Sequence, residues 1–218
     1  MKRGGNLKFA KKWWIPLLLF SIFVTFTAYL MLSFIMPIPN IIQFESVLNS
    51  FTDFIGVLFM LLLISIAEEF GWRGYALDRL QAKFQTSKYT AVKASIFLGI
   101  IWICWHIPLF FTKGEGKAFE TQYFPFFLVM ATLLTISFTW FHNNSSGGVL
   151  AAIVFHTAIN FAGIVIPITS SSSIQSNLGY VALDGVILIL TLIIIIVFGA
   201  KTLVRGAKQE KNTNTSHS

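Results

Sequence analysis

The chain has 218 residues, of which 55% are hydrophobic and only 11% are charged. Soluble domains carry about 25% charged residues, so this composition excludes an ordinary soluble domain. A mean hydropathy of +0.73 and 23 phenylalanines indicate an integral membrane protein. The net charge of +7 does not then predict nucleic-acid binding, because basic residues in membrane proteins are topology signals. We therefore expect the lipid bilayer as a partner and no nucleic acid.

The hydropathy of the chain predicts six membrane spans, each near the ~20 residues that cross a bilayer. The spans are residues 13–36, 52–72, 94–112, 123–141, 147–167 and 179–200. The predicted fold class is an all-α integral membrane protein, a bundle of about six transmembrane helices with a polar site buried among spans 2, 3 and 5. The membrane domain covers residues 13–200, with its core motifs at 50–168. A basic segment (1–12) precedes it, and a basic, disordered tail (201–218) follows.

The basic residues predict the orientation of these spans. If both termini are cytoplasmic, only Lys113 and Lys117 of the 16 Lys and Arg residues lie outside. This distribution obeys the positive-inside rule, so we expect a multi-pass protein with both ends in the cytoplasm. Cys104 lies in an apolar run and is expected to be a small buried residue.

The second span ends in two adjacent glutamates, in EEFGWR at residues 68–73. A charge near the middle of a bilayer costs about 2.5–3.5 kcal/mol on insertion scales, so the two carboxylates mark either the end of a span or a site. Glu69 and Arg73 are four residues apart and share a helix face, which predicts a charge-assisted pair. Glu68 is turned about 100° away, with no cation within a turn. We predict that Glu69 is a structural acid and that Glu68 is an unpaired acid available for function.

Two further spans carry polar residues inside apolar sequence. FLGIIWICWHIPLFF places His106 two residues before Pro108, and AAIVFHTAINF places His156 and Asn160 four residues apart on one helix face. His106 alone would be explained by a bond to a backbone carbonyl freed at the proline. His156 and Asn160 alone would be explained as hydrogen-bonding contacts between helices, worth under ~1–2 kcal/mol.

The depth of these residues in the membrane favours one shared site. Counted inward from the cytoplasmic ends of their spans at 1.5 Å per residue, Glu68, His106 and His156 lie ~16, ~20 and ~18 Å deep. Unrelated contacts would not be expected to coincide in this way. A single polar cluster, reached from the cytoplasm, is the prediction.

These residue types suit hydrolysis of an acyl or peptide bond. Glu68 beside His106 can orient and deprotonate a water molecule. His156 with Asn160 can donate hydrogen bonds to a developing oxyanion. Glu68, His106 and His156 are also an established type of zinc-ligand set, although the H-E-x-x-H helical motif is absent. The residues leave both chemistries open.

Three motifs in order carry a resemblance to a known family. They are E-E-x-x-x-R at residues 68–73, aromatic-x-x-x-H at 102–106 and H-x-x-x-N at 156–160. The chain resembles the CAAX-protease and bacteriocin-processing family of intramembrane proteases, which includes type II CAAX prenyl endopeptidases and bacteriocin-immunity proteins. Trp102 stands where the pattern often has phenylalanine, which keeps an aromatic wall.

The resemblance implies a role for each motif residue. Glu68 and His106 would activate the water, and His156 with Asn160 would form the oxyanion hole. The family has been described both as metalloproteases and as glutamate-dependent proteases. The implied cofactor is accordingly a divalent metal such as zinc, held by Glu68, His106 and His156, or none.

Glu69 and Arg73 would support that site. The leading hypothesis is an intramembrane endopeptidase of a bacterial plasma membrane that acts on a peptide or membrane-protein substrate. The alternative is a non-catalytic bacteriocin-immunity or scaffold protein that keeps the motifs. A third class is a proton-coupled transporter that uses Glu68 and His106 as a relay.

Overall fold

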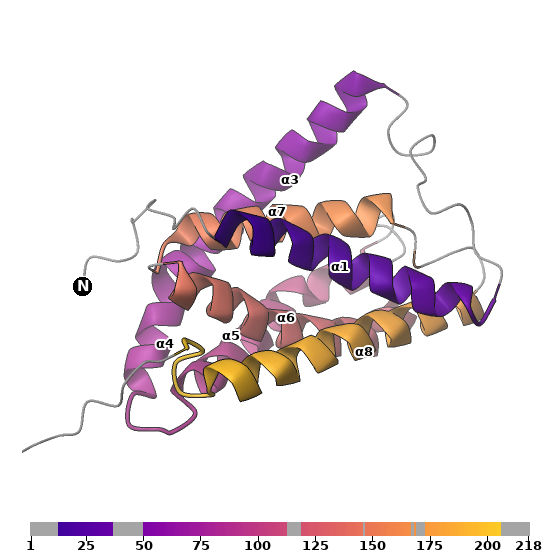
Figure 1. Ribbon diagram of the computed structural model, residues 1–218. Coiled ribbons are helices and arrows are strands. Elements are labelled where there is room, and N and C mark those ends of the chain that lie inside the picture. The colour runs from indigo at the N-terminus through magenta and orange to yellow at the C-terminus, as the bar shows by residue number, and fades with distance from the viewer. Residues whose placement is uncertain are drawn as a thin grey trace, which may run out of the picture.

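The computed structural model describes residues 13–36, 50–112, 119–145, 147–166, 168 and 173–205. Every regular element within these ranges is a helix, which confirms the all-α prediction (Figure 1). The longer helices are α1 (Trp14–Ser33), α3 (Phe51–Gly71), α5 (Thr90–His106), α6 (Phe124–Asn144), α7 (Val149–Val165) and α8 (Ser173–Phe198). The short ones are the π-helical turn η2 (Trp72–Ala76), α4 (Leu77–Lys83) and the 3₁₀ turns η3 (Ile107–Phe111) and η5 (Thr121–Tyr123).

Five helical runs in the described residues are long and apolar enough to cross a membrane, as judged by length and composition. They are Ile15–Ser33, Phe51–Lys83, Thr90–Phe111, Thr121–Asn144 and Ser173–Phe198. The shorter apolar helix Val149–Val165 coincides with the fifth predicted span. Each predicted span therefore overlaps a helix, although the second continues to Lys83 instead of ending at residue 72, because α3, η2 and α4 run on without a break.

The helices pack as a bundle around aromatic side chains from three of them. α6 contacts α5 and α8, α1 contacts α8 and α7, and α3 lies against α7. The ring of Phe155 on α7 lies 5.4 Å from Phe20, 4.6 Å from Phe138 and 4.8 Å from Phe141. Aromatic rings prefer such tilted and edge-to-face contacts at 4.5–7 Å, so part of the phenylalanine content fills this core.

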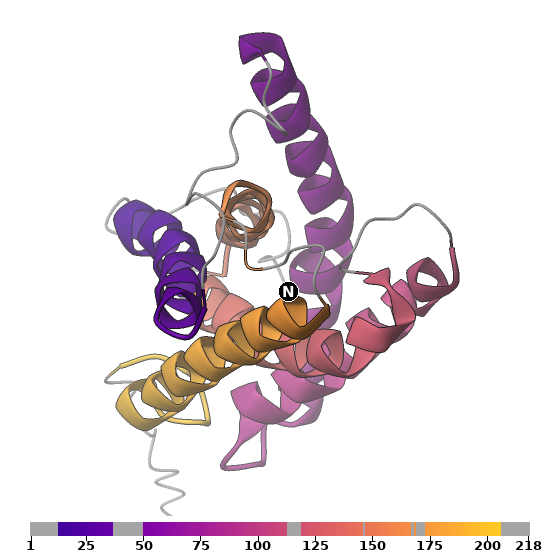
Figure 2. The same ribbon diagram turned by 90° about the vertical axis from the view of Figure 1, so that its right-hand side faces the viewer.

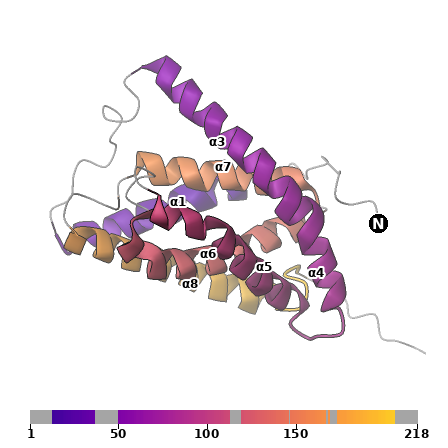
Figure 3. The same cartoon turned by 180° about the vertical axis from the view of Figure 1, so that it is seen from behind.

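The N-terminal half of α3 projects from the bundle in all three views (Figures 1, 2 and 3). Its large apolar side chains remain exposed, Phe51 by 79% and Phe59 by 59%, as expected for a surface that faces lipid. Between α1, α3 and α7 lies a cavity of about 560 Å³, which we call the α1–α3–α7 groove. Its lining is apolar except for Thr157, and α1 contributes Leu18 and Ile22 to it.

Cys104 was expected to be buried, and this expectation is wrong. The thiol is free and exposed on α5, where Ile100, Ile101 and Trp105 are also exposed. An apolar residue of a membrane protein can face lipid instead of the core, so hydropathy alone does not predict burial.

After α8 the chain turns back and covers the start of α5. The backbone N–H of Ala91 donates to the carbonyl of Lys201 at 3.0 Å, and that of Val92 donates to Ala200 at 3.3 Å. The first N–H groups of a helix have no partner within the helix, so the returning segment caps α5.

Two asparagines at the end of α6 hold the same returning segment. Asn143 Nδ2 donates to the Thr202 carbonyl at 2.8 Å, and Asn144 Nδ2 donates to the Leu203 carbonyl at 2.7 Å. Leu203 is fully buried and has a φ of 54°, a conformation that leucine rarely adopts and that the surrounding contacts hold. Residues 201–205 of the expected tail thus pack on the bundle. Residues 1–12 and 206–218, with Lys113 and Lys117, lie outside the described residues.

Candidate active site

Glu69 and Arg73 form the pair that their spacing predicts. Arg73 Nη1 donates to Glu69 Oε1 at 2.7 Å and to Oε2 at 2.9 Å, and both side chains are fully buried. The guanidinium carbon lies 3.9 Å from the ring centroid of Phe138 on α6. A cation over an aromatic face is stabilised by the ring quadrupole, so the pair is held by α6 as well as by its own helix.

His156 on α7 is a second partner of Glu69, which the sequence did not reveal. Its Nδ1 lies 2.9 Å from Glu69 Oε1, across 87 residues of sequence. A carboxylate that is already paired with Arg73 accepts hydrogen bonds, so Nδ1 carries the hydrogen. The other ring nitrogen, Nε2, then remains for the site. The same carboxylate therefore neutralises Arg73 and orients His156.

Glu68 forms no salt bridge in the described part of the chain, as its spacing predicts, but its carboxylate has a neutral donor that was not expected. Trp102 Nε1 on α5 donates a hydrogen bond to Glu68 Oε2 at 2.7 Å. Trp102 is buried, whereas Glu68 is half-buried. The donor comes from a different helix, and spacing along one helix does not reveal such a partner.

His106 ends α5 beside this tryptophan. Its Nδ1 lies 2.8 Å from the carbonyl oxygen of Trp102, one helical turn earlier. A carbonyl can only accept, so Nδ1 carries the hydrogen and Nε2 keeps its lone pair. The ring is half-buried and lies against Phe119 and Phe127, at centroid distances of 6.2 and 5.2 Å. The Trp102 carbonyl lies within the regular part of α5 and is not the one that Pro108 frees, and the bond leaves Nε2 of His106 available as a base.

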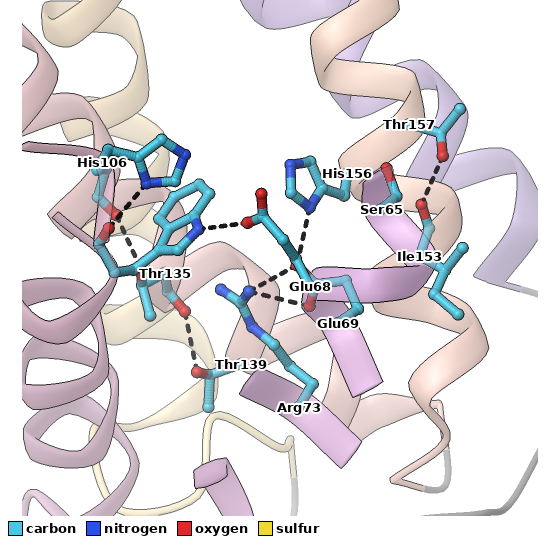
Figure 4. Close-up of polar contacts among 12 residues, drawn as sticks. Ser65, Glu68, Glu69, Arg73, His106, Thr135, Thr139, Ile153, His156 and Thr157 are labelled. Carbon is cyan, nitrogen blue, oxygen red and sulfur yellow. Dashed lines mark hydrogen bonds and ion pairs between the residues drawn. The ribbon is translucent and has the colours of Figure 1, made fainter. Parts of the chain in front are cut away.

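The three side chains predicted at one depth meet around the indole of Trp102. The ring centroid of Trp102 lies 5.2 Å from that of His106 and 5.7 Å from that of His156, and the indole N–H holds Glu68. In Figure 4 the carboxylate of Glu68 lies between the rings of His106 and His156. Asn160 follows His156 by one turn of α7 and is half-buried, and no side-chain hydrogen bond of Asn160 is found in the described part of the chain.

Hydroxyl groups fix α5, which carries the indole, to α6. Ser95 Oγ on α5 donates to Thr139 Oγ1 on α6 at 2.7 Å. Thr139 Oγ1 in turn donates to the carbonyl of Thr135 at 2.9 Å (Figure 4). Near this bond Gly99 approaches α6 so closely that an added Cβ would lie 3.3 Å from Thr132 Cα. Small residues allow such close helix contacts in membranes. The indole of α5 is thereby placed on a rigid support.

The residues fit a metal ion poorly. In the ranges that the structure describes, no group of three or more His, Cys, Asp or Glu side chains is placed so that it could hold one. The hydrogen bonds that these side chains make would not themselves prevent binding, because Glu68 Oε1 and the Nε2 atoms of His106 and His156 remain free within the described residues. The placement of the three side chains is what does not suit an ion. The arrangement of Glu68, His106 and His156 is therefore not that of a ligand set for zinc.

A bundle of membrane-spanning helices around buried and half-buried carboxylates and imidazoles defines a multi-pass membrane protein with an intramembrane polar site. Residues 50–162 match the sequence profile of the family described as type II CAAX prenyl endopeptidase Rce1-like, and the chain belongs to that family. The matched residues include all six predicted site residues. This confirms the family resemblance.

A curated relative points in the same direction. The protein named CAAX prenyl protease 2 of Methanococcus maripaludis is 34% identical over 183 residues, which cover 80% of this chain and 64% of the relative. The chain thus spans a little under two thirds of the length of that relative.

Proposed function

We propose that the chain is an intramembrane endopeptidase that hydrolyses a peptide bond of a membrane-associated peptide or protein. One observation supports it above the others. A single indole gathers Glu68, His106 and His156 within a membrane bundle, where an isolated carboxylate would be costly. Membership of the Rce1-like family supports the reaction class.

In the proposed reaction, Glu68 and His106 activate the attacking water. Glu68 Oε1 is free of the indole, and His106 Nε2 keeps a lone pair because its Nδ1–H is used on a carbonyl. A water molecule between these two acceptors would be oriented by both and would give up its proton to Glu68. A positioned base of this kind contributes roughly 10²–10⁴-fold to the rate. Glu68 would later pass the proton to the leaving amine.

His156 and Asn160 stabilise the oxyanion in this proposal. Nδ1–H of His156 is used on Glu69, so Nε2 can donate only if the ring carries both protons. The cluster can balance that charge, because Glu68 and Glu69 bring two negative charges against the single positive charge of Arg73. Asn160 supplies a second donor through its amide. Loss of one oxyanion donor costs about 10²–10³-fold in turnover.

Glu69 and Arg73 support this site without taking part in the reaction. Glu69 holds His156 by one hydrogen bond and Arg73 by two contacts, all of them buried. The proposed mechanism uses no metal, and it is supported by the poor fit of these side chains to a ligand set.

The α1–α3–α7 groove is a suitable place for the apolar part of a membrane-borne substrate. Two of its lining residues, Thr157 and Phe161, directly follow His156 and Asn160 in the sequence. Its apolar surface would accept a hydrocarbon chain or an apolar helix, since bringing either one there costs no polar desolvation. We propose that the groove holds the substrate beside the oxyanion donors.

We place the protein in the plasma membrane of a bacterium, as a multi-pass protein with both termini in the cytoplasm. The basic residues support this orientation, since Lys and Arg gather at the cytoplasmic ends of spans. The bacterial assignment rests on the resemblance to bacteriocin-processing proteins. The matched relative is from Methanococcus maripaludis.

The test compares the membrane proteome of cells that produce the wild type or Glu68→Gln at equal abundance. Cleavage products should appear with the wild type and disappear with Glu68→Gln, because the base is removed while the shape is kept. Glu120→Gln is the matched control, since Glu120 is exposed and its carboxylate accepts a hydrogen bond from the nearby Gln122.

The same two proteins, wild type and Glu68→Gln, also separate the competing functions when partner capture and dependence on a proton gradient are measured. A protein that captures partners equally with and without Glu68, and cuts none, would be the non-catalytic scaffold. A phenotype that requires a proton gradient but shows no cleavage would indicate the transporter instead.

A further inference from the structure

We infer that Trp102 is a positioning residue, whose indole N–H holds the carboxylate of Glu68 so that one chosen oxygen faces the reacting water. This inference rests on the proposed function. The geometry behind it is the 2.7 Å hydrogen bond from Trp102 Nε1 to Glu68 Oε2, which joins α5 to the end of α3 across 34 residues of sequence.

The donor chemistry of the indole decides which oxygen acts. Trp Nε1–H donates and never accepts, so Oε2 must be the acceptor in this contact. A proton on Oε2 would disturb that bond, whereas a proton on Oε1 leaves it intact. Glu68 therefore takes the proton from water at Oε1. This bond runs to a charged acceptor, and such bonds are the short and strong ones, so it can select one side-chain conformation.

The indole itself has little freedom to move. Its ring is only 6% exposed and packs against Phe138 at 6.1 Å, as well as against His106 and His156. The Arg73 guanidinium carbon lies 5.7 Å from the ring centroid. The donor is therefore fixed from several sides, and the carboxylate that it holds inherits that fixed position.

A phenylalanine at this position would fill most of the same space but would donate nothing. Trp102→Phe thus removes the hydrogen bond and keeps the aromatic wall. Trp105 supplies the matched control, because it lies on the same helix, is exposed and has an aromatic neighbour in Trp72 at 6.4 Å. Trp105→Phe is the same chemical change away from Glu68.

The first experiment needs no substrate. In protein labelled with ¹⁵N-tryptophan and held in lipid nanodiscs, the six tryptophans give six indole N–H resonances. Glu68→Gln should move one of them upfield, because a neutral amide accepts more weakly than a carboxylate. That resonance should be the one missing in Trp102→Phe, and it should remain in Trp105→Phe. If Glu68→Gln moves no indole resonance, the inference is wrong, and this comparison does not require any tryptophan variant to fold.

The second experiment measures peptide-bond cleavage by the same proteins. Trp102→Phe should lower kcat on the order of 10²-fold with KM nearly unchanged, because a misplaced base slows the reaction without loosening the substrate. Trp105→Phe should match the wild type. A wild-type kcat in Trp102→Phe would overturn the inference and leave the proposed function standing. An inactive wild type would instead refute the proposed function, while the resonances still report the hydrogen bond.

Discussion

His156 Nδ1 on α7 lies 2.9 Å from Glu69 Oε1 on α3. The carboxylate of Glu69 that accepts this hydrogen bond also pairs with Arg73. The two glutamates of EEFGWR are therefore divided between two sets of contacts. Glu69 faces α7 and the buried arginine, whereas Glu68 faces the indole of α5.

This division predicts different outcomes for the two acids. Glu69→Gln should lower stability by about 3–5 kcal/mol, because Arg73 would keep its charge in a buried place without a carboxylate partner. Glu68→Gln should leave stability near the wild-type value and abolish cleavage. Thermal unfolding in detergent and abundance in the membrane give the stability, and a cleavage assay gives the activity. If both variants lose the same activity at unchanged abundance, the division of roles is wrong.

The oxyanion role of α7 predicts a kinetic effect without a binding effect. Asn160→Ala should reduce turnover about 10²–10³-fold while substrate still binds. His156→Ala should act similarly, with an added loss of stability because Glu69 would lose a hydrogen bond. Single-turnover rates and direct binding measurements separate the two effects. Weakened binding at an unchanged rate would contradict the oxyanion role.

The metal-free mechanism predicts that chelators have little effect on the purified wild type. Elemental analysis should find no stoichiometric zinc in the wild type, in His156→Ala or in Asn160→Ala. Zinc present at one equivalent in the wild type and lost in His156→Ala would establish His156 as a ligand and defeat the mechanism.

The α1–α3–α7 groove predicts a change in KM when it is filled. Ala158 lines the groove, so Ala158→Phe should raise KM several-fold and leave kcat near the wild-type value for substrates that still bind. Gly163→Phe is the control on the same helix, because Gly163 is exposed and an added Cβ there would meet no neighbouring atom. If Ala158→Phe and Gly163→Phe have the same KM and kcat, the groove does not bind the substrate.

The orientation of the chain can be tested by reporter fusions. Fusions after residue 88 and at the C-terminus should report the cytoplasm, and a fusion at Gly116 should report the outside. An external C-terminus would contradict the expected topology and the approach to the site from the cytoplasm.

Much of the fold follows from patterns that act along one helix. Apolar runs of about 20 residues place the spans, and spacing of four residues predicts the Glu69–Arg73 pair that the structure contains. Equal depth also predicts that Glu68, His106 and His156 gather, since depth is set by helical rise alone.

Contacts between helices cannot be predicted from such patterns. The rotation of each helix about its axis decides that His156 reaches Glu69 and that Trp102 reaches Glu68, and hydropathy barely constrains this rotation when one face meets lipid. Trp102 carried a signal nonetheless. It is a tryptophan in a position where an aromatic wall would need only phenylalanine, and its N–H requires a partner when buried.

The π-helical turn η2 has a consequence for how the first acidic motif is connected to the rest of the bundle. The N–H of Leu77 bonds to the carbonyl of Trp72, five residues back, so the turn holds one residue more than an α-helical turn. Each residue of an α-helix advances the direction of side chains by about 100°, so Glu69 and Leu77, which are separated by eight positions, would point about 80° apart in a helix without this turn. The extra residue in η2 removes most of this difference, so the continuous helix buries both Glu69, which contacts His156 of α7, and Leu77, which packs with Leu98 of α5. Deleting Gly74 would convert η2 to a regular α-helical turn and leave Leu77 near its present direction, so a one-residue deletion here should be far better tolerated than one in the middle of α3.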